Sequence, residues 1–409
     1  MGFTTQLLHS DRRYGVEHGN LLKPIHPGVT YGYEDAHDLA RVFQGKQKGY
    51  TYGRQINPTV EALEQKITQM ENGRATVAFS TGMAAIGTTL FALLRSGDHV
   101  IASKYLFGNT ASLFESFGVQ GIALTFVDAT DAEAVAAAVQ PNTKLVFVET
   151  IANPRTQVSD LVGIGAVCKS LGLIYVVDNT LTTPYLFQPK SVGASLVINS
   201  LTKYIGGHGN ALGGSVTEMG QFDWTTFANI YDGYRVGEPS LWGINQIKKK
   251  GLRDFGASLA ADSAHRLSTG ADTLALRMAR ACDNASALAE FFQSHDLIDA
   301  VYYPGLKDHP QHQRTRELFG RPGAILSIEL QPELDCFRFL NQLQTVIKAT
   351  HLGDVRTLSI PVAHSIFYEI GPERRADMGI KDNLIRFSVG IEEIDDLLED
   401  FEQALSSVR

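Results

Sequence analysis

The chain has 409 residues, and its 36 Lys and Arg against 44 Asp and Glu give a formal net charge of −8. This acidic balance, with no basic run longer than the three lysines at 248–250, excludes a nucleic-acid-binding surface. Residues 1–13 lack the apolar core of a signal peptide, and the uncharged stretch 75–94 holds too many hydroxyls and glycines for a membrane span, so we expect no membrane partner. We expect residues 75–94 to form a loop followed by a core helix.

The three cysteines, at 168, 282 and 336, are odd in number and too far apart for the spacing of a metal site. We therefore expect no metal and a reducing, cytoplasmic environment. With 44% hydrophobic and 20% charged residues, the composition is that of an ordinary globular chain, long enough for two or three domains.

Residues 1–57 are rich in Gly, His and Tyr, and Pro24 and Pro27 interrupt any periodicity. Such a segment has little core of its own. We therefore expect an extended N-terminal arm that lies against another part of the molecule or a neighbouring subunit.

A helix is predicted directly after this arm. Asn57 can cap it and Pro58 suits the first helical position. Apolar residues then recur at helical spacing up to Met70, and Asn72 and Gly73 end the pattern.

Regular alternation of helices and strands follows. Helices are predicted at about 83–95, 109–117, 131–139 and 160–171, and strands at 98–102, 122–127, 144–149, 173–178 and 196–199. This α/β alternation predicts a mostly parallel sheet that is covered by helices on both faces. Ligands in such sheets bind beyond the C-terminal ends of the strands.

The pattern changes near residue 254, which we take as the end of a large domain, 58–254. An Ala-rich helical region then places five apolar side chains on one face: Leu274, Met278, Cys282, Leu288 and Phe292. In the polar run 308–316, His309 and His312 fit a solvated turn better than a metal site. Short strands and a final amphipathic helix complete a predicted smaller α/β domain, 255–409.

The residues that carry chemistry lie between 176 and 214. One β-rich segment ends in Asp178, and the next leads to Ser200, Thr202 and Lys203. In a parallel sheet both ends fall on the same edge. A lysine that forms an imine, hydroxyls that bind phosphate and a buried carboxylate that keeps a pyridine nitrogen protonated together suit a phosphorylated aromatic aldehyde cofactor.

Further motifs agree with this one over nearly the whole chain: Tyr52-Gly53-Arg54 with Asn57-Pro58-Thr59, Ser80 to Ala85, Glu149-Thr150 with Asn153-Pro154, and Arg386 to Gly390. In this order and spacing, they resemble the Cys/Met-metabolism family of pyridoxal-phosphate (PLP) enzymes, the transsulfuration enzymes related to cystathionine γ-synthase. The resemblance implies an aspartate-aminotransferase-like fold (fold type I), with a central, mostly parallel, seven-stranded sheet and a smaller C-terminal α/β domain. It also implies a homotetramer made of two dimers with shared active sites.

The resemblance also implies a role for each matching residue. Lys203 would hold the cofactor aldehyde and act as the base, Asp178 would face the ring nitrogen, and Arg386 would bind the substrate carboxylate. The other implied cofactor contacts are Asn153 at the ring oxygen, Gly82, Met83, Ser200 and Thr202 at the phosphate, Phe107 stacked on the ring, and Tyr52 and Arg54 at the phosphate of the adjacent subunit.

Two departures from the family pattern concern the substrate. Phe107 stands where most relatives have a Tyr, so it can stack but cannot donate a proton. Where relatives read Ser-Leu-Gly, this chain has His351, followed by Asp354 and Arg356. We hypothesise that His351 or Arg356 alters how the substrate side chain is held or how its leaving group is protonated. The alternative is that they form a buried ion pair or a cap.

The expected reaction is γ-elimination on a 2-amino acid of homoserine type with oxygen, sulfur or an oxyguanidino group at Cγ, as in methionine, cystathionine or canavanine. The alternative is γ-replacement, as in an O-acetyl- or O-succinylhomoserine sulfhydrylase or a cystathionine γ-synthase. Release of a 2-oxo acid without added thiol would separate the two. A catalytically silent cofactor-binding protein is disfavoured, because the set of lysine, aspartate and carboxylate-binding arginine is complete.

Overall fold

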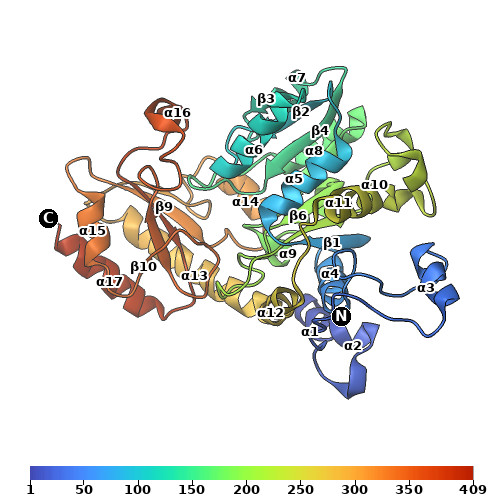
Figure 1. Cartoon of the computed structure of the whole chain (residues 1–409). Coiled ribbons are helices and arrows are strands. Elements are labelled where there is room, and N and C mark those ends of the chain that lie inside the picture. The colour runs from blue at the N-terminus through green and yellow to red at the C-terminus, as the bar shows by residue number, and fades with distance from the viewer. Residues whose placement is uncertain (409) are drawn as a thin grey trace.

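The computed structural model describes residues 1–408 and contains two β-sheets with helices packed beside each (Figure 1). The first sheet has seven strands in the order β1-β7-β6-β5-β4-β2-β3. β7 runs antiparallel to its neighbours β1 and β6, and the other pairs in the sheet are parallel. The strands are β1 Ala75–Phe79, β2 His99–Ser103, β3 Ala123–Val127, β4 Thr143–Glu149, β5 Ile174–Asp178, β6 Leu196–Asn199 and β7 Gly214–Glu218.

The five predicted strands are confirmed as β2 to β6, whereas β1 and β7 were not predicted. The prediction of a loop before the helix in residues 75–94 was wrong for 75–79, which form a buried strand. The physical reason is that β1 leads through the short turn 80–81 into an equally apolar helix, so the hydrophobic run shows no boundary. β7 begins with glycine and reads as part of the glycine-rich loop.

Helices cover both faces of the seven-stranded sheet, as predicted. α5 (Gly82–Leu93) and α6 (Gly108–Val119) share one hydrophobic core with alternate strand residues, whereas α4 (Pro58–Met70) and α8 (Leu161–Leu171) share the other. The predicted cap of α4 is present, because Asn57 Oδ1 accepts hydrogen bonds from the amides of Thr59 at 2.9 Å and Val60 at 3.3 Å.

Short segments connect these elements: α7 Ala132–Ala137, α9 Thr183–Leu186, α10 Trp242–Gln246, α11 Arg253–Phe255, 3₁₀ turns at Glu17–Gly19, Pro189–Val192, Trp224–Thr226, Asp232–Tyr234 and Pro239–Leu241, and a π-helical turn at Ile247–Leu252.

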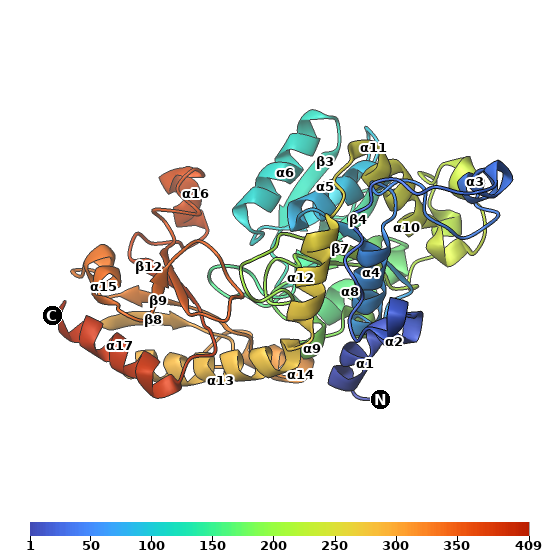
Figure 2. The ribbon, with the colours of Figure 1, turned by 60° about the horizontal axis from the view of Figure 1, so that its bottom comes forward.

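The second sheet has five strands in the order β10-β11-β12-β9-β8. Its strands are β8 Ile298–Tyr302, β9 Ile325–Leu330, β10 Ile347–Lys348, β11 Leu358–Pro361 and β12 Leu384–Ser388. The helices in this part of the chain are α12 Ala261–Ala271, α13 Leu274–Gln293, α14 His312–Leu318, α15 Cys336–Gln342, α16 Gly371–Asp377 and α17 Ile394–Ser406. Figure 2 shows α13 and α17 side by side beneath β8 and β9. All five apolar residues predicted for one face of α13 are buried.

The N-terminal segment differs from the predicted extended arm because it contains three short helices. α1 (Phe3–Leu8) and α2 (Ser10–Tyr14) pack on α4, where Leu7 is buried. α3 (Ala36–Phe43) has no buried residue and lies apart from α1 and α2 (Figure 1). Helices of five to eight residues show too few periodic positions to stand out in a Gly-, His- and Tyr-rich sequence.

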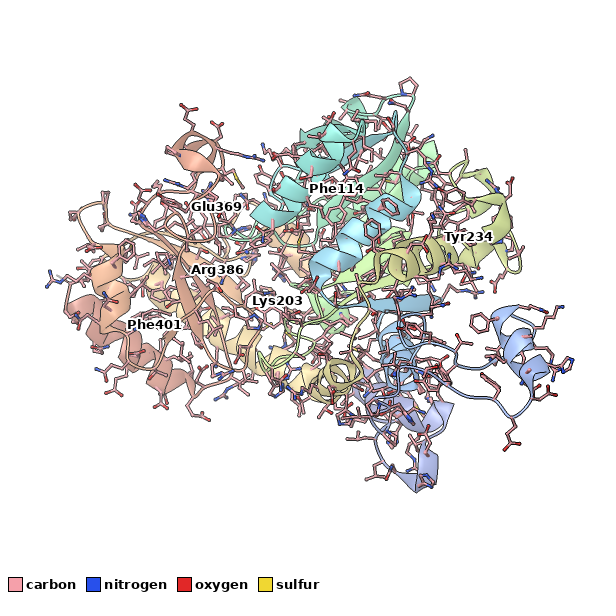
Figure 3. All side chains as sticks on the ribbon, in the orientation of Figure 1. Phe114, Lys203, Tyr234, Glu369, Arg386 and Phe401 are labelled. Atoms are coloured by element: carbon pink, nitrogen blue, oxygen red, sulfur yellow. The ribbon has the colours of Figure 1, made fainter. Side chains whose placement is uncertain are left out.

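None of the helices within residues 1–408 combines the length and the apolar character that crossing a bilayer requires. A side-chain view places Lys203, in the turn after β6, and Arg386, on β12, between the two sheets (Figure 3). The carboxyl ends of the parallel strands therefore face the second sheet.

Candidate active site

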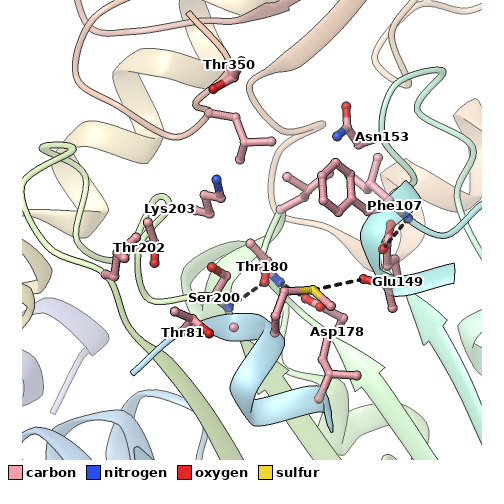
Figure 4. A pocket seen from close by; sticks show the side chains of 18 of the residues that line it. Thr81, Phe107, Glu149, Asn153, Asp178, Thr180, Ser200, Thr202, Lys203 and Thr350 are labelled. Carbon is pink, nitrogen blue, oxygen red and sulfur yellow. Dashed lines mark hydrogen bonds between the residues drawn. The ribbon is translucent and has the colours of Figure 1, made fainter. Parts of the chain in front are cut away.

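A cavity of about 250 Å³ lies where β4, β5 and β6 end, and residues of the second sheet complete its wall (Figure 4). The structure brings nine of the predicted site residues together in this wall: Gly82, Met83, Phe107, Asn153, Asp178, Ser200, Thr202, Lys203 and Arg386. They come from segments up to 304 residues apart in the chain, between Gly82 and Arg386. The shared edge of the parallel sheet explains why they meet.

Lys203 occupies a tight turn after β6. The turn is closed by hydrogen bonds from Lys203 N to the Ser200 carbonyl at 3.1 Å and from Gly207 N to the Lys203 carbonyl at 2.7 Å. Burial and the positive charge of Arg386 lower the pKa of the Lys203 amine to about 8. This amine is therefore neutral in a much larger fraction of molecules near pH 7 than an exposed lysine.

A buried guanidinium holds the backbone of the same turn. Arg277, on α13, donates to the carbonyl oxygens of Tyr204 at 2.6 Å and Ile205 at 3.1 Å, and to that of Gly270 at 2.7 Å. No role was predicted for Arg277, because an arginine in a helical pattern gives no indication of its partners.

Two carboxyl groups lie side by side at the ends of neighbouring strands. Glu149 ends β4, Asp178 ends β5, and the two residues are paired in register. Asp178 accepts from the Thr180 amide at 2.9 Å, and Glu149 accepts from the Phe107 amide at 3.0 Å. Burial raises the pKa of both, and that of Glu149 reaches about 8 because the Asp178 charge adds to the effect.

Glu149 belongs to the motif Glu149-Thr150, but no separate role was predicted for it. In the structure it lines the cavity and fixes the backbone of Phe107. Phe107 in turn precedes α6, so this contact orients the start of a helix at the cavity wall.

The N-terminus of α5 forms part of the cavity wall. Thr81 caps the helix by accepting from the Ala84 amide at 3.0 Å, and the first helical residues are Gly82 and Met83. The backbone here is tightly packed: a Cβ on Gly214 would lie 2.2 Å from the Thr81 carbonyl oxygen, and one on Gly82 would lie 2.8 Å from Ser200 Cβ. Free amides and the helix dipole at this position favour an anion such as a phosphate.

Arg386 is almost completely buried and retains one unused donor. Its guanidinium donates to the His351 carbonyl at 2.9 Å, the Thr350 carbonyl at 3.3 Å and Asn153 Oδ1 at 3.4 Å. Its Nε has no hydrogen-bond partner among residues 1–408. Burial lowers its pKa to about 10, so the group stays charged. A buried cation with a free donor fits an incoming carboxylate.

His351 and Arg356 lie beside this cavity and not in its wall. They line an adjoining cavity of about 700 Å³ that shares Thr202 and Leu212 with the first. His351 Nδ1 lies 3.4 Å from Lys203 Nζ. Arg356 pairs with Asp354 at 2.7 Å, and its side chain is 55% exposed.

Tyr52 and Arg54 do not reach the cavity within one chain. Arg54 donates to the Arg253 carbonyl at 2.6 Å, and its guanidinium lies 5.4 Å from the centre of the Tyr52 ring. Both side chains are exposed.

The polar run 308–316 forms the predicted turn only at residues 308–311, because α14 begins at His312 and includes the rest of the run. His312 N donates to the His309 carbonyl at 2.9 Å, and His312 Nδ1 lies 3.2 Å from the Pro304 carbonyl. Across residues 1–408, no three His, Cys, Asp or Glu side chains are grouped so that they could hold a metal ion. All three cysteines are free and buried.

Comparison with known proteins identifies the family to which the chain is similar. The sequence profile of the Cys/Met metabolism PLP-dependent enzymes matches residues 4–406. The L-methionine γ-lyase of Pseudomonas putida is 37% identical over 99% of this chain and 98% of its own length, and the cystathionine γ-lyase of Bacillus subtilis (strain 168) is 35% identical over 99% of each.

Solved structures agree. The crystal structure described as an O-acetylhomoserine (thiol)-lyase from Campylobacter jejuni is 30% identical, covers 99% of this chain and 100% of its own, and superimposes with a TM-score of 0.92. That structure carries an N′-pyridoxyl-lysine-5′-monophosphate. The resemblance, the fold type I architecture, the PLP cofactor and an enzymatic activity on amino acids are thus confirmed: the chain belongs to the Cys/Met-metabolism family of PLP-dependent enzymes.

Proposed function

We propose that this enzyme catalyses γ-elimination on a γ-substituted 2-amino acid of homoserine type, with oxygen, sulfur or an oxyguanidino group at Cγ. One observation carries the proposal. The buried guanidinium of Arg386 lines the same cavity as Lys203, and its Nε has no hydrogen-bond partner among residues 1–408. Two γ-lyases of 37% and 35% identity over the full chain support the reaction type.

The cavity fits PLP by the chemistry of its donors. Lys203 would bind the aldehyde, Asp178 would hold the protonated ring nitrogen, and the amides at the start of α5 would hold the phosphate. The further contacts we assign are Ser200 and Thr202 at the phosphate, Asn153 at the ring oxygen and Phe107 on the ring face. When bound, the cofactor supplies an electron sink that acidifies the substrate's Cα proton.

The protein's own part is binding and proton transfer. Arg386 holds the α-carboxylate and so fixes the direction of the Cα–H bond. The Lys203 amine, neutral at a lower pH than an exposed lysine, would take the Cα proton, deliver it to the former aldehyde carbon (C4′) and, neutral again, take one from Cβ. Departure of the γ-substituent then leaves an unsaturated product that hydrolyses to a 2-oxo acid and ammonia.

γ-Replacement is the second candidate, and the similarity to an O-acetylhomoserine (thiol)-lyase structure favours it. Both reactions share the steps up to loss of the substituent and differ in what is added next. A panel of γ-substituted amino acids separates them. 2-Oxo acid release without added thiol supports elimination, whereas turnover that depends strictly on sulfide or cysteine supports replacement.

We also propose a homotetramer built from two dimers, in which Tyr52 and Arg54 of one chain reach the cofactor phosphate of its neighbour. Their exposure on a single chain supports this arrangement. So do four exposed apolar side chains of the same N-terminal segment, Leu21, Leu22, Val29 and Phe43. Residues 1–57 would form the arm that contacts the neighbour, 58–254 the PLP-binding domain and 255–409 the small domain. Three free, buried cysteines support a cytoplasmic location.

A further inference from the structure

The departing group needs a proton, and no tyrosine hydroxyl stands at position 107 to supply it. An alkoxide, thiolate or similar anion leaves Cγ slowly unless it is protonated as it departs. Phe107 has no hydroxyl, and Arg386 stays charged and bound to carbonyl oxygens. The carboxyl groups of Asp178 and Glu149 are held by the Thr180 and Phe107 amides. The Lys203 ammonium, formed when the amine takes a proton from Cβ, is therefore the proton source, and a further group must carry that proton to the heteroatom.

His351 occupies the boundary between the two cavities. Its neighbours in the chain, Thr350 and Leu352, line the 250 Å³ cavity that contains Lys203, whereas His351 itself lines the adjoining 700 Å³ cavity. Its backbone carbonyl accepts from Arg386 at 2.9 Å, which fixes the residue next to the site of the substrate carboxylate.

The two nitrogens of the imidazole are differently placed. Nδ1 lies 3.4 Å from Lys203 Nζ, whereas Nε2 is buried and, in the described part of the chain, has no hydrogen-bond partner. When the Lys203 amine is protonated it donates to Nδ1, so the single proton of a neutral imidazole lies on Nε2.

We infer that His351 is a catalytic residue that relays a proton from the Lys203 ammonium to the γ-heteroatom of the substrate as the Cγ–heteroatom bond breaks. This inference rests on the proposed γ-elimination or on γ-replacement, because both reactions pass through the loss of the γ-substituent.

The relay conserves protons and electrons. Lys203, having taken a proton from Cβ, gives it to Nδ1, and Nε2 gives its own proton to the heteroatom. The electron pair of the Cγ–heteroatom bond leaves with the heteroatom, which departs as a neutral alcohol, thiol or hydroxyl compound. Lys203 is again a neutral amine, and the imidazole is neutral with its proton on the other nitrogen.

The surroundings of the imidazole keep it in the neutral form that a relay needs. Burial and the adjacent Lys203 lower the pKa of His351 to about 4, and Arg386 and Arg356 act in the same direction. Asp354 opposes them, but its carboxylate is already paired with Arg356.

The geometry also decides between the two residues that the sequence left open. Arg356 binds Asp354 through Nε at 2.7 Å and Nη2 at 2.9 Å. A guanidinium has no lone pair to accept a proton, so it cannot relay one. Arg356 therefore forms an ion pair with Asp354 in which the Arg356 side chain stays 55% exposed, whereas His351 carries the proton.

The test compares substrates whose leaving groups differ in their need for a proton. His351→Asn places an acceptor near the position of Nδ1, and His351→Gln places an amide near that of Nε2, but neither side chain can relay. Each holoenzyme is assayed with a γ-thioether, which needs protonation, and with O-acetylhomoserine, whose acetate leaves as an anion. The matched control is His208→Asn. His208 is exposed, and its Nδ1 lies 2.7 Å from the Gly206 carbonyl oxygen.

We expect both His351 variants to lose on the order of 100-fold in turnover of the thioether and less than threefold with O-acetylhomoserine. Exchange of the substrate's Cα proton with D₂O precedes the relay and stays within twofold of wild type. Equal losses on both substrates, or loss of Cα exchange, would overturn the relay and make His351 a residue that positions Lys203. A wild type without Cα exchange would instead refute the proposed function.

A readout independent of turnover is the ¹⁵N NMR spectrum of the histidine-labelled, cofactor-free protein, in which the Lys203 ammonium is free to donate to Nδ1, with the His351 signal assigned by its absence in His351→Asn. At pH 7 we expect a neutral ring protonated at Nε2. A ring protonated at Nδ1, or at both nitrogens, would contradict the relay.

Discussion

The Lys203 amine lies 3.4 Å from Nδ1 of His351, and the backbone carbonyl of His351 accepts a hydrogen bond from Arg386 at 2.9 Å. One residue therefore connects the proposed catalytic amine with the proposed carboxylate-binding guanidinium.

The first prediction concerns the pKa of Lys203. Because burial and Arg386 lower it to about 8, the neutral, nucleophilic amine should appear as the pH rises through about 8. Competitive acetylation of the cofactor-free protein, followed by peptide mass spectrometry with exposed Lys169 as the internal reference, should show Lys203 labelling with a midpoint near that pH. A midpoint above 10 would contradict the environment described for the amine.

The second prediction concerns substrate binding by Arg386. Arg386→Lys keeps the charge but loses the two-pronged geometry, and a hydrogen bond to a charged group contributes about 1.5–3 kcal/mol. We expect kcat/KM to fall about 10- to 150-fold, mainly through KM. The control is Arg374→Lys, which alters an exposed ion pair with Glu115 at 2.8 Å and should stay within about twofold of wild type. An unchanged KM in Arg386→Lys would remove Arg386 from the carboxylate site.

The third prediction uses two glycines near the phosphate-binding end of α5. A Cβ at position 214 would lie 2.2 Å from the Thr81 carbonyl oxygen, so Gly214→Ala must displace the start of the helix. We expect at least a tenfold weaker affinity for PLP, measured by fluorescence titration. Gly87 lies inside the same helix, and its Cβ would meet Leu113 at an ordinary 3.6 Å. Gly87→Ala should therefore stabilise the fold by about 0.5–1 kcal/mol and leave the affinity for PLP unchanged.

The fourth prediction concerns Asp178. Asp178→Asn keeps an oxygen to accept from the Thr180 amide but removes the negative charge that we place at the ring nitrogen. Loss of one charged contact of this kind lowers turnover on the order of 10²- to 10³-fold. We expect bound PLP to remain near wild-type levels while 2-oxo acid release falls by this factor. Full activity in Asp178→Asn would place the ring nitrogen elsewhere.

The fifth prediction tests the shared active sites. Lys203→Ala and Arg54→Ala should each be almost inactive alone. If each site combines Lys203 of one chain with Arg54 of its neighbour, random mixing of the two variants restores about a quarter of wild-type activity, because half of the dimers carry one intact site of two. Mixtures that stay inactive after subunit exchange, with exchange verified by native mass spectrometry, would show that the sites are not shared.

Of the elements that position this site, the sequence correctly predicted those with a strong local signal, such as a helix cap or a clear alternation of strands and helices. The cap at Asn57 and the strands that end in Glu149 and Asp178 are where the alternation placed them. Strand β1 was missed because its apolar run continues almost directly into α5, and β7 because a short strand that begins with glycine resembles a loop.

The sequence predicted which residues form the site but not the contacts between them. The motifs named Lys203, Asp178 and Arg386, whereas the contacts of Glu149 with Phe107 and of Arg277 with the lysine turn depend on packing between distant segments. A local sequence pattern carries no information about such contacts. The same holds for His351, whose proximity to Lys203 became visible only once the second sheet was placed against the first.

The most direct measurement is borohydride reduction of the PLP-loaded enzyme followed by peptide mapping. We predict that one pyridoxyl group becomes fixed per chain and that it lies on Lys203. A pyridoxyl group on a different lysine, or none at all in a protein with bound PLP, would contradict the account.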